Sequence, residues 1–77
     1  MKTAVITGAA RGIGAATAKL FAEKGFNVCV NYVRSEKKAQ ALARALPSAV
    51  AIKADVSIKE EARALIDTAV ETFGGID

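Results

Sequence analysis

The sequence predicts an α/β fold in which strands and helices alternate as β-α-β-α-β-α, the N-terminal portion of a doubly wound parallel sheet. Short apolar runs of strand length alternate with helical patterns of about a dozen residues. A glycine-rich stretch, 7–14, joins the first run to the first helical pattern. Hydrophobic residues make up 52% of the 77 residues, enough for one folded domain, 1–77. This alternation implies parallel pairing, with ligands at the carboxyl ends of the strands.

The first strand is expected over residues 2–7, whose small and β-branched side chains suit a strand covered on both faces. The first helix, expected over 12–24, carries apolar residues at i, i+3, i+7 and i+8, which predicts one buried stripe. The stripe consists of Ile13, Ala16, Leu20 and Phe21. Gly25 is expected to end this helix in a left-handed conformation.

The second strand is expected over 26–32, with Cys29 as a small buried hydrophobe rather than a reactive thiol. Ser35 is a candidate N-cap of the second helix, and Pro47 is expected to stop that helix. The apolar residues of the helix follow the spacing i, i+3, i+4 and i+7, which predicts a single buried face. They are Ala39, Leu42, Ala43 and Leu46.

The third strand is expected over 49–54, and a capping box, Ser57-x-x-Glu60, is expected to begin the third helix. One face of this helix is apolar, which predicts that it packs on the sheet. That face holds Ala62, Leu65, Ile66, Ala69 and Phe73. Gly74-Gly75 is expected to end the helix, and Ile76-Asp77 has the pattern of a beginning fourth strand.

The stretch Thr7-Gly8-Ala9-Ala10-Arg11-Gly12-Ile13-Gly14 lies between the first strand and the first helix, and its glycines suit a backbone that approaches an anion. Gly8 permits a sharp turn, Gly12 keeps the backbone N–H groups open to a diphosphate, and Gly14 allows close packing of helix on sheet. A helix start carries unpaired N–H groups and partial positive charge, so a pyrophosphate is the expected ligand. The alternative is a strand-to-helix turn without a ligand. No Gly-Lys-Ser/Thr follows, so the stretch is not a Walker loop.

The charge is unevenly distributed along the chain. Residues 1–54 hold nine Lys or Arg and two Glu, a net charge of +7, whereas residues 55–77 hold two Lys or Arg and six acids, a net charge of −4. The basic residues fall on polar helix faces without interleaved aromatic residues, so we expect no nucleic-acid partner. The chain has one cysteine and no histidine, which favours a cytoplasmic setting and argues against a metal site or a disulfide framework. No apolar run reaches membrane-spanning length, so no membrane association is expected.

The glycine stretch resembles the T-G-x-x-x-G-I-G signature of the short-chain dehydrogenase/reductase family and matches it at every fixed position. Within that family the chain is most similar to members of the 3-oxoacyl-[acyl-carrier-protein] reductase type. This similarity rests on Thr-Gly-Ala-x-Arg-Gly-Ile-Gly, Val-x-Val-Asn-Tyr and Lys-Ala-Asp-Val. The resemblance covers the whole chain but only about the first third of such an enzyme. It implies a Rossmann-type sheet with strand order 3-2-1-4-5-6-7.

The resemblance implies a nicotinamide dinucleotide cofactor, and the residues around the second strand favour NADP(H) over NAD(H). Domains that bind NAD place an acid at the end of this strand, where the chain instead has Asn31, Tyr32, Val33 and Arg34. In NADP-preferring relatives a basic residue just before the second glycine, as Arg11 stands here, faces the 2′-phosphate. Arg34 lies one place beyond the basic residue of some relatives. The alternative for either arginine is a solvated surface residue.

The resemblance also assigns the remaining cofactor contacts. Ala10 and Ile13 belong to the glycine turn, and Asn31 and Tyr32 are expected beside the adenosine. Asp55 would accept a hydrogen bond from the adenine amino group, with Val56 against the ring. The alternative for Asp55 is an acid favoured by the turn and by the following helix.

Catalytic residues are not predicted within these 77 residues. Relatives carry Asn-Asn-Ala-Gly after the fourth strand, then a catalytic Ser and a Tyr-x-x-x-Lys pair, which would lie beyond Asp77. Tyr32 is the only tyrosine, and Glu36 rather than Lys stands four residues on. The chain is therefore expected to be the cofactor-binding part of an enzyme that acts on a carbonyl or alcohol substrate. The alternative is a stand-alone, non-catalytic module that binds nucleotide or self-associates.

The first strand is expected to have an open, apolar edge, because its second neighbour in the resembled sheet is the fourth strand. Such an edge exposes unpaired N–H and C=O groups that can pair with another chain. Residues 1–77 are therefore expected to form a homo-oligomer or to be covered by further polypeptide.

Overall fold

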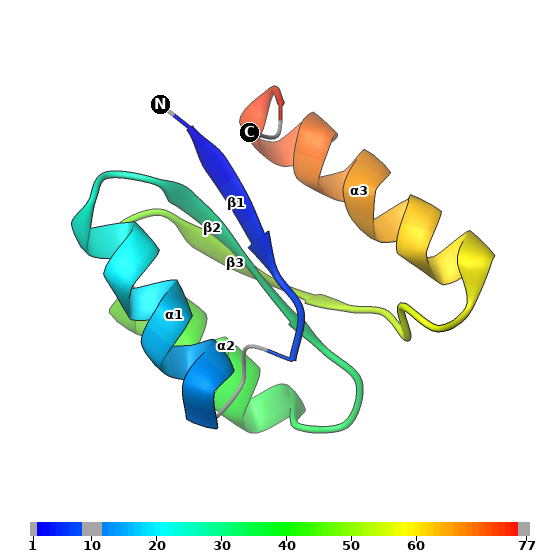
Figure 1. Ribbon diagram of the computed structural model, residues 1–77, viewed down its shortest axis with the longest axis horizontal. Coiled ribbons are helices and arrows are strands. Elements are labelled where there is room, and N and C mark those ends of the chain that lie inside the picture. Colours follow the sequence, from blue (N-terminus) through cyan, green and yellow to red (C-terminus); the bar gives the residue numbers. More distant parts are fainter. Residues whose placement is uncertain (1, 9–11, 76–77) are drawn as a thin grey trace.

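The structure, a computed structural model, describes residues 2–8 and 12–75 and contains three strands and three helices in strict alternation (Figure 1). The strands form one parallel sheet in the order β1-β2-β3. The elements are β1 (Thr3–Ile6), α1 (Gly12–Glu23), β2 (Asn27–Tyr32), α2 (Glu36–Ala45), β3 (Ala49–Lys53) and α3 (Lys59–Phe73). The predicted α/β order is therefore confirmed. Ile76-Asp77, expected to begin a fourth strand, lie outside the described residues.

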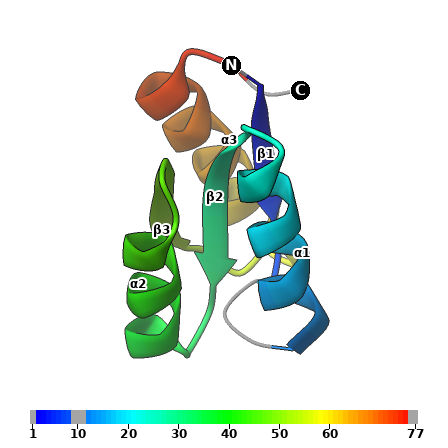
Figure 2. The same cartoon turned by 90° about the vertical axis from the view of Figure 1, so that its left-hand side faces the viewer.

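The sheet is covered on both faces, with α1 and α2 on one face and α3 on the other (Figures 1 and 2). The central strand, β2, is buried along its whole length. Cα partners run from Val5 to Cys29 and from Cys29 to Val50, so all three strands point the same way in aligned register. Their carboxyl ends therefore meet at one end of the sheet.

The main core lies between β2 and the two helices α1 and α2, and alternation along β2 decides which residues enter it. Val28, Val30 and Tyr32 belong to this cluster, together with Ala18 and Ala22 of α1 and with Ala39, Leu42 and Ala43 of α2. Cys29 is fully buried, as predicted, and burial raises the pKa of its thiol to about 11. Three of the four residues predicted for the buried face of α2 are thus confirmed, whereas Leu46 lies at the C-cap and is half-buried.

The stripe predicted for α1 is wrong in most of its members. Ile13 is 87% exposed and Leu20 is 52% exposed, whereas Ala18 and Ala22 are buried. Ala16 is exposed as well. The helix is apolar around most of its circumference, so periodicity alone did not fix its rotation, and alanines let it approach the sheet more closely than large side chains would. Phe21 is half-buried and makes an edge-to-face contact with Phe26, with ring centroids 4.9 Å apart.

Glycines end two helices as expected, with a φ of 88° at Gly25 and 86° at Gly74. The capping box at Ser57 is wrong: α3 begins at Lys59 with Ile58 at its N-cap, and no side chain caps it. The Ser57 hydroxyl and backbone N–H both donate to Asp55 Oδ1 (2.6 Å and 3.0 Å), which holds Ser57 in the loop one residue before the N-cap. Ser35 does occupy the N-cap of α2, but its side chain makes no capping hydrogen bond.

The face of α3 is only partly as predicted. Leu65 and Ala69 are buried, Ala62 and Phe73 are half-buried, and Ile66 is 44% exposed. Among the described residues, no helix has both the length and the apolar character needed to cross a membrane.

Candidate nucleotide-binding site

The predicted site residues lie in, or directly beside, the three loops that follow the strands at the carboxyl end of the sheet. Gly8 follows β1, Arg34 follows β2 and Asp55 follows β3. Parallel strands bring these loops to one edge, which is where α/β sheets bind ligands. The structure therefore brings together residues that lie up to 47 positions apart in the sequence (55 − 8).

Two glycines of the turn, Gly8 and Gly12, lie within the described residues and have a left-handed backbone. Gly8 has a φ of 62° and Gly12 a φ of 63°, both in the left-handed region that disfavours other residues. A Cβ atom placed on either glycine would meet no atom within 4 Å, so the space beside both is open. Ala10 and Arg11 lie outside the described residues. Gly14 is half-buried in the first turn of α1, which begins at Gly12.

These features fit a dinucleotide phosphate. The start of α1 offers backbone N–H groups that no residue of the helix can accept from, and the dipole of the helix favours negative charge there. Ile13 is almost fully exposed at this point, so an apolar side chain lies beside the turn and is free to contact a ligand.

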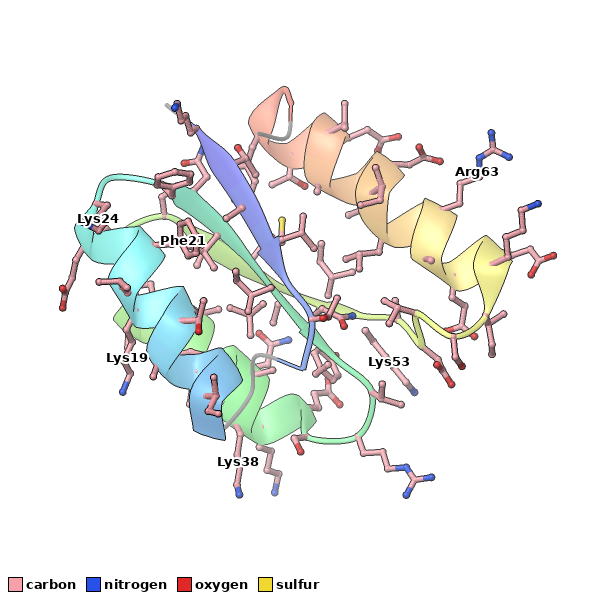
Figure 3. All side chains as sticks on the ribbon, viewed as in Figure 1. Lys19, Phe21, Lys24, Lys38, Lys53 and Arg63 are labelled. Atoms are coloured by element: carbon pink, nitrogen blue, oxygen red, sulfur yellow. The ribbon has the colours of Figure 1, made fainter. Side chains whose placement is uncertain are left out.

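The loop after β2 leads into a cavity of about 420 Å³ at the N-terminal end of α2. It is lined by Arg34, Ser35, Glu36, Lys37 and Lys38. Three cations against one carboxylate make the cavity basic, and the Ser35 hydroxyl adds a hydrogen-bonding group. Figure 3 shows Lys38 at the end of the molecule where α1 begins.

Tyr32 and Asn31 have side chains directed into the protein. Tyr32 is 7% exposed and packs in the core shared with α1 and α2. Asn31 is 1% exposed, and its Nδ2 donates to the carbonyl oxygens of Ile52 (3.3 Å) and Ala54 (3.0 Å). Their expected contact with adenosine remains a prediction.

The loop after β3 is organised around the Asp55 carboxylate. Ser57 donates to Asp55 Oδ1 from its hydroxyl (2.6 Å) and from its backbone N–H (3.0 Å). These two bonds, together with the positive charge of Arg34, hold the pKa of Asp55 below its usual range. The Asp55 N–H donates to Glu61 Oε1 (2.9 Å), and Val56 is 43% exposed beside it.

Sequence reasoning missed several residues at this site. Glu61 lies one turn into α3, and no sequence signal linked it to the N–H group of Asp55 six positions earlier. Lys37 and Lys38 were assigned only to a polar helix face, although their position in the first turn of α2, directly after the predicted N-cap, could have placed them at the site.

The amino end of the sheet has a different character. Asn27 Nδ2 donates to Thr3 Oγ1 (3.2 Å), and the Ser48 hydroxyl donates to Asn27 Oδ1 (2.6 Å), so one amide of β2 is bonded to β1 and to the residue that precedes β3. A second cavity, of about 270 Å³, lies between the C-terminal ends of α1 and α2; Ala22, Leu46 and Pro47 are among its lining residues. Within residues 2–8 and 12–75, no group of three or more His, Cys, Asp or Glu side chains could hold a metal ion.

Comparison with known families shows which proteins the chain is similar to. A family model described as short chain dehydrogenase matches residues 2–77. An uncharacterised oxidoreductase of Methylorubrum extorquens is 46% identical over 80 residues, which covers 99% of this chain and 32% of that protein. A 3-oxoacyl-[acyl-carrier-protein] reductase of Staphylococcus aureus is 41% identical over 80 residues, with the same coverage.

Two further relatives give the same result. A putative ketoacyl reductase of the granaticin polyketide synthase of Streptomyces violaceoruber is 45% identical over 74 residues, covering 96% of this chain and 30% of that protein. The crystal structure of a dehydrogenase/reductase from Sinorhizobium meliloti superposes with a TM-score of 0.93 at 44% identity, covering 99% of this chain and 32% of that one. The chain thus spans about a third of the length of the relatives it matches.

Proposed function

The chain belongs to the short-chain dehydrogenase family, and we propose that it is the NADP(H)-binding N-terminal portion of an oxidoreductase that acts on a carbonyl or alcohol. The observation that carries this proposal is the pair of left-handed glycines, Gly8 and Gly12, with open space beside both at the carboxyl end of the sheet. A nicotinamide dinucleotide, which the family implies, would supply or accept the hydride when bound.

In this proposal the glycine turn holds the pyrophosphate. Gly8 and Gly12 keep side chains away from the phosphates, and the first N–H groups of α1 donate to them. Ala10 and Ile13 contact the cofactor from the same turn, while Gly14 keeps the helix close to the sheet. These residues bind and orient the cofactor and move no proton.

The preference for NADP(H) rests on charge around the second strand. No acid stands at 31–34, where a carboxylate would bind the ribose 2′-hydroxyl and repel a 2′-phosphate. The basic cavity of Arg34, Lys37 and Lys38 lies directly after β2, at the place where that phosphate would lie. Arg11 would approach it from the glycine turn, and guanidinium groups suit phosphate geometry.

At the far end of the cofactor, the proposal places adenine against the loop after β3. Asp55 is ionised and half-exposed, so its carboxylate can accept a hydrogen bond from the adenine amino group. The side chain of Val56 is exposed beside it and offers an apolar contact to the ring.

The substrate and the catalytic groups belong to the part of the relatives that this chain does not span. Two of those relatives are named as reductases of 3-oxoacyl-[acyl-carrier-protein] and of ketoacyl groups, which favours a 3-oxoacyl substrate class here. We place the protein in the cytoplasm, because its single cysteine is buried as a neutral thiol and gives no disulfide framework. Nucleic-acid and membrane partners form no part of the proposal.

Self-association completes the proposal. Within residues 2–8 and 12–75, β1 pairs only with β2, so its other edge offers backbone groups to a second copy. Exposed apolar residues of α1, on one face of the sheet, and of α3, on the other face, would also favour association. They are Ile13 and Leu20 of α1 and Ile66 and Val70 of α3.

The test is a calorimetric titration of the protein with NADPH and NADH, repeated on Arg11→Ala and Arg34→Ala. NADPH should bind more tightly than NADH, and each substitution should reduce the difference between the two affinities. A hydrogen bond to a charged group contributes about 1.5–3 kcal/mol, so the loss reaches about tenfold or more. Arg34 should show the smaller effect, because it is exposed and already near Asp55.

Arg63→Ala is the matched control. Figure 3 shows Arg63 projecting outward from α3, away from the glycine turn and α2, so its removal should leave both affinities unchanged. Equal affinities of the unsubstituted protein for NADPH and NADH would contradict the NADP(H) preference.

A further inference from the structure

Strand β2 carries a buried amide, Asn31, whose hydrogen bonds reach beyond the end of the neighbouring strand. The last Cα pair of the β2–β3 ladder joins Tyr32 and Lys53, where β3 ends. The Asn31 side chain continues the connection one residue further, because its Nδ2 donates to the carbonyl oxygen of Ala54 as well as to that of Ile52.

The residue held in this way directly precedes Asp55. Ala54 is fixed from both sides, since its N–H donates to the Tyr32 carbonyl (3.0 Å) while its carbonyl accepts from Asn31 (3.0 Å). Ala54 is itself 2% exposed, so both hydrogen bonds are buried. Losing either would leave a buried polar group unsatisfied, which is costly. Asp55 therefore leaves the sheet from a fixed point.

The Asp55 carboxylate is then oriented by its own loop. Both Ser57 donors reach the same oxygen, Oδ1, and the Asp55 N–H is held by Glu61 Oε1. No hydrogen bond within the described residues reaches Oδ2. This leaves one carboxylate oxygen at a defined position, available for a donor from a ligand.

We infer that Asn31 is a positioning residue for adenine recognition: it fixes Ala54, and thereby the Asp55 carboxylate, without contacting the nucleotide through its own side chain. The inference rests on the proposed function, in which Asp55 accepts from the adenine amino group. Because a hydrogen bond weakens steeply with distance and angle, a shift of about 1 Å in this loop is enough to lose it.

The test compares two nucleotides that differ at the adenine amino group: NADP⁺ and its hypoxanthine analogue, which lacks that group. The measured quantity is the ratio of their affinities by calorimetry. The unsubstituted protein should prefer NADP⁺ by about tenfold, the worth of one hydrogen bond to a carboxylate. In Asn31→Leu this ratio should fall to about one, with binding of the analogue little changed.

The matched control is Asn27→Leu, four residues earlier on the same strand and the same face. Asn27 is also a buried amide that bridges strands, so its loss should lower the urea midpoint to a similar degree. Its bonds lie at the amino end of the sheet, and the preference for NADP⁺ should therefore survive. A purely structural role for Asn31 would likewise leave the ratio intact.

Each outcome separates the inference from the function on which it rests. Retention of the full preference by Asn31→Leu overturns the inference alone, as does an equal loss of both nucleotides, which would indicate direct contact with the shared part of the cofactor. Failure of the unsubstituted protein to bind either nucleotide overturns the proposed function. If Asn31→Leu does not fold, the same ratio is measured on Asn31→Ser, where a lowered ratio supports the inference and an unchanged one overturns it.

Discussion

The two ends of the sheet use the same residue type for different purposes. At the amino end, the Asn27 side chain bonds to the side chains of Thr3 in β1 and of Ser48, which directly precedes β3. At the carboxyl end, the Asn31 side chain donates to the backbone carbonyls of Ile52 and Ala54. The first arrangement links side chains across the sheet, whereas the second supports a loop that carries a half-exposed carboxylate.

From this difference we expect the amino end of the sheet to matter mainly for stability and the carboxyl end mainly for nucleotide binding. The carboxyl end holds open space beside two glycines, a basic cavity, and a carboxylate whose pKa is lowered by Ser57. The amino end holds a polar network of the three strands and a smaller cavity between helix ends. Substitutions at the amino end should therefore alter the free energy of unfolding, and those at the carboxyl end should alter nucleotide affinity.

The largest expected effect compares two left-handed glycines, one at each end. Gly12→Val should abolish detectable dinucleotide binding, because a branched side chain would occupy the space where the pyrophosphate meets the backbone. Gly25→Val is the control: its φ of 88° imposes the same kind of strain, about 1–2 kcal/mol, at the end of α1 far from the site. Thermal unfolding should show similar losses for both, and titration should show lost binding only for Gly12→Val. Normal dinucleotide binding by Gly12→Val would contradict the assignment of the glycine turn as the pyrophosphate site.

The open edge of β1 limits the comparison between the ends, because association would make stability depend on concentration. We expect the 77-residue chain to associate and to dissociate on dilution, as sedimentation velocity would measure. Ile66→Lys should weaken the association by charging an exposed apolar face of α3. Thr68→Lys adds the same charge at an exposed polar position of that helix and should not. A folded chain that sediments as a monomer at every concentration would contradict this expectation.

The smallest effect concerns Cys29, which lies midway between the two asparagines on β2. Burial raises the pKa of its thiol to about 11, above the usual value of about 8.5. A raised pKa in the folded state means that the contribution to stability is complete below about pH 8.5 and is lost as pH rises toward 11. Urea unfolding as a function of pH, with Cys29→Ala as the control, should show a decline in this range that the variant lacks. The same decline in both proteins would assign the effect to other groups.

Much of this architecture follows from the sequence, because alternating strand and helix patterns and glycines at helix ends act locally. The rotation of α1 did not follow, since Ile13 and Leu20 compete with Ala18 and Ala22 for the sheet and only tertiary packing decides between them. The start of α3 was misplaced for a similar reason: two hydrogen bonds from Ser57 to the Asp55 carboxylate hold Ser57 in the preceding loop, outside the helix.

For the candidate site too, the local features could be predicted from the sequence, whereas contacts between distant elements could not. The glycine turn and Asp55 have motifs, and their placement at one edge follows from parallel pairing. The direction of the Asn31 side chain and the bond from Asp55 to Glu61 depend on contacts between elements 21 to 23 and 6 residues apart, which no local pattern encodes.

The most direct test of the division between the two ends is a map of backbone amide chemical shifts in the ¹⁵N-labelled chain during titration with NADP⁺. The account predicts that the shifts gather at the carboxyl end, at Gly8, Gly12, Arg34 and Asp55, while those of Gly25, Asn27 and Ser48 remain in place. Shifts centred on the amino end, or no shifts in a folded chain at millimolar nucleotide, would contradict it.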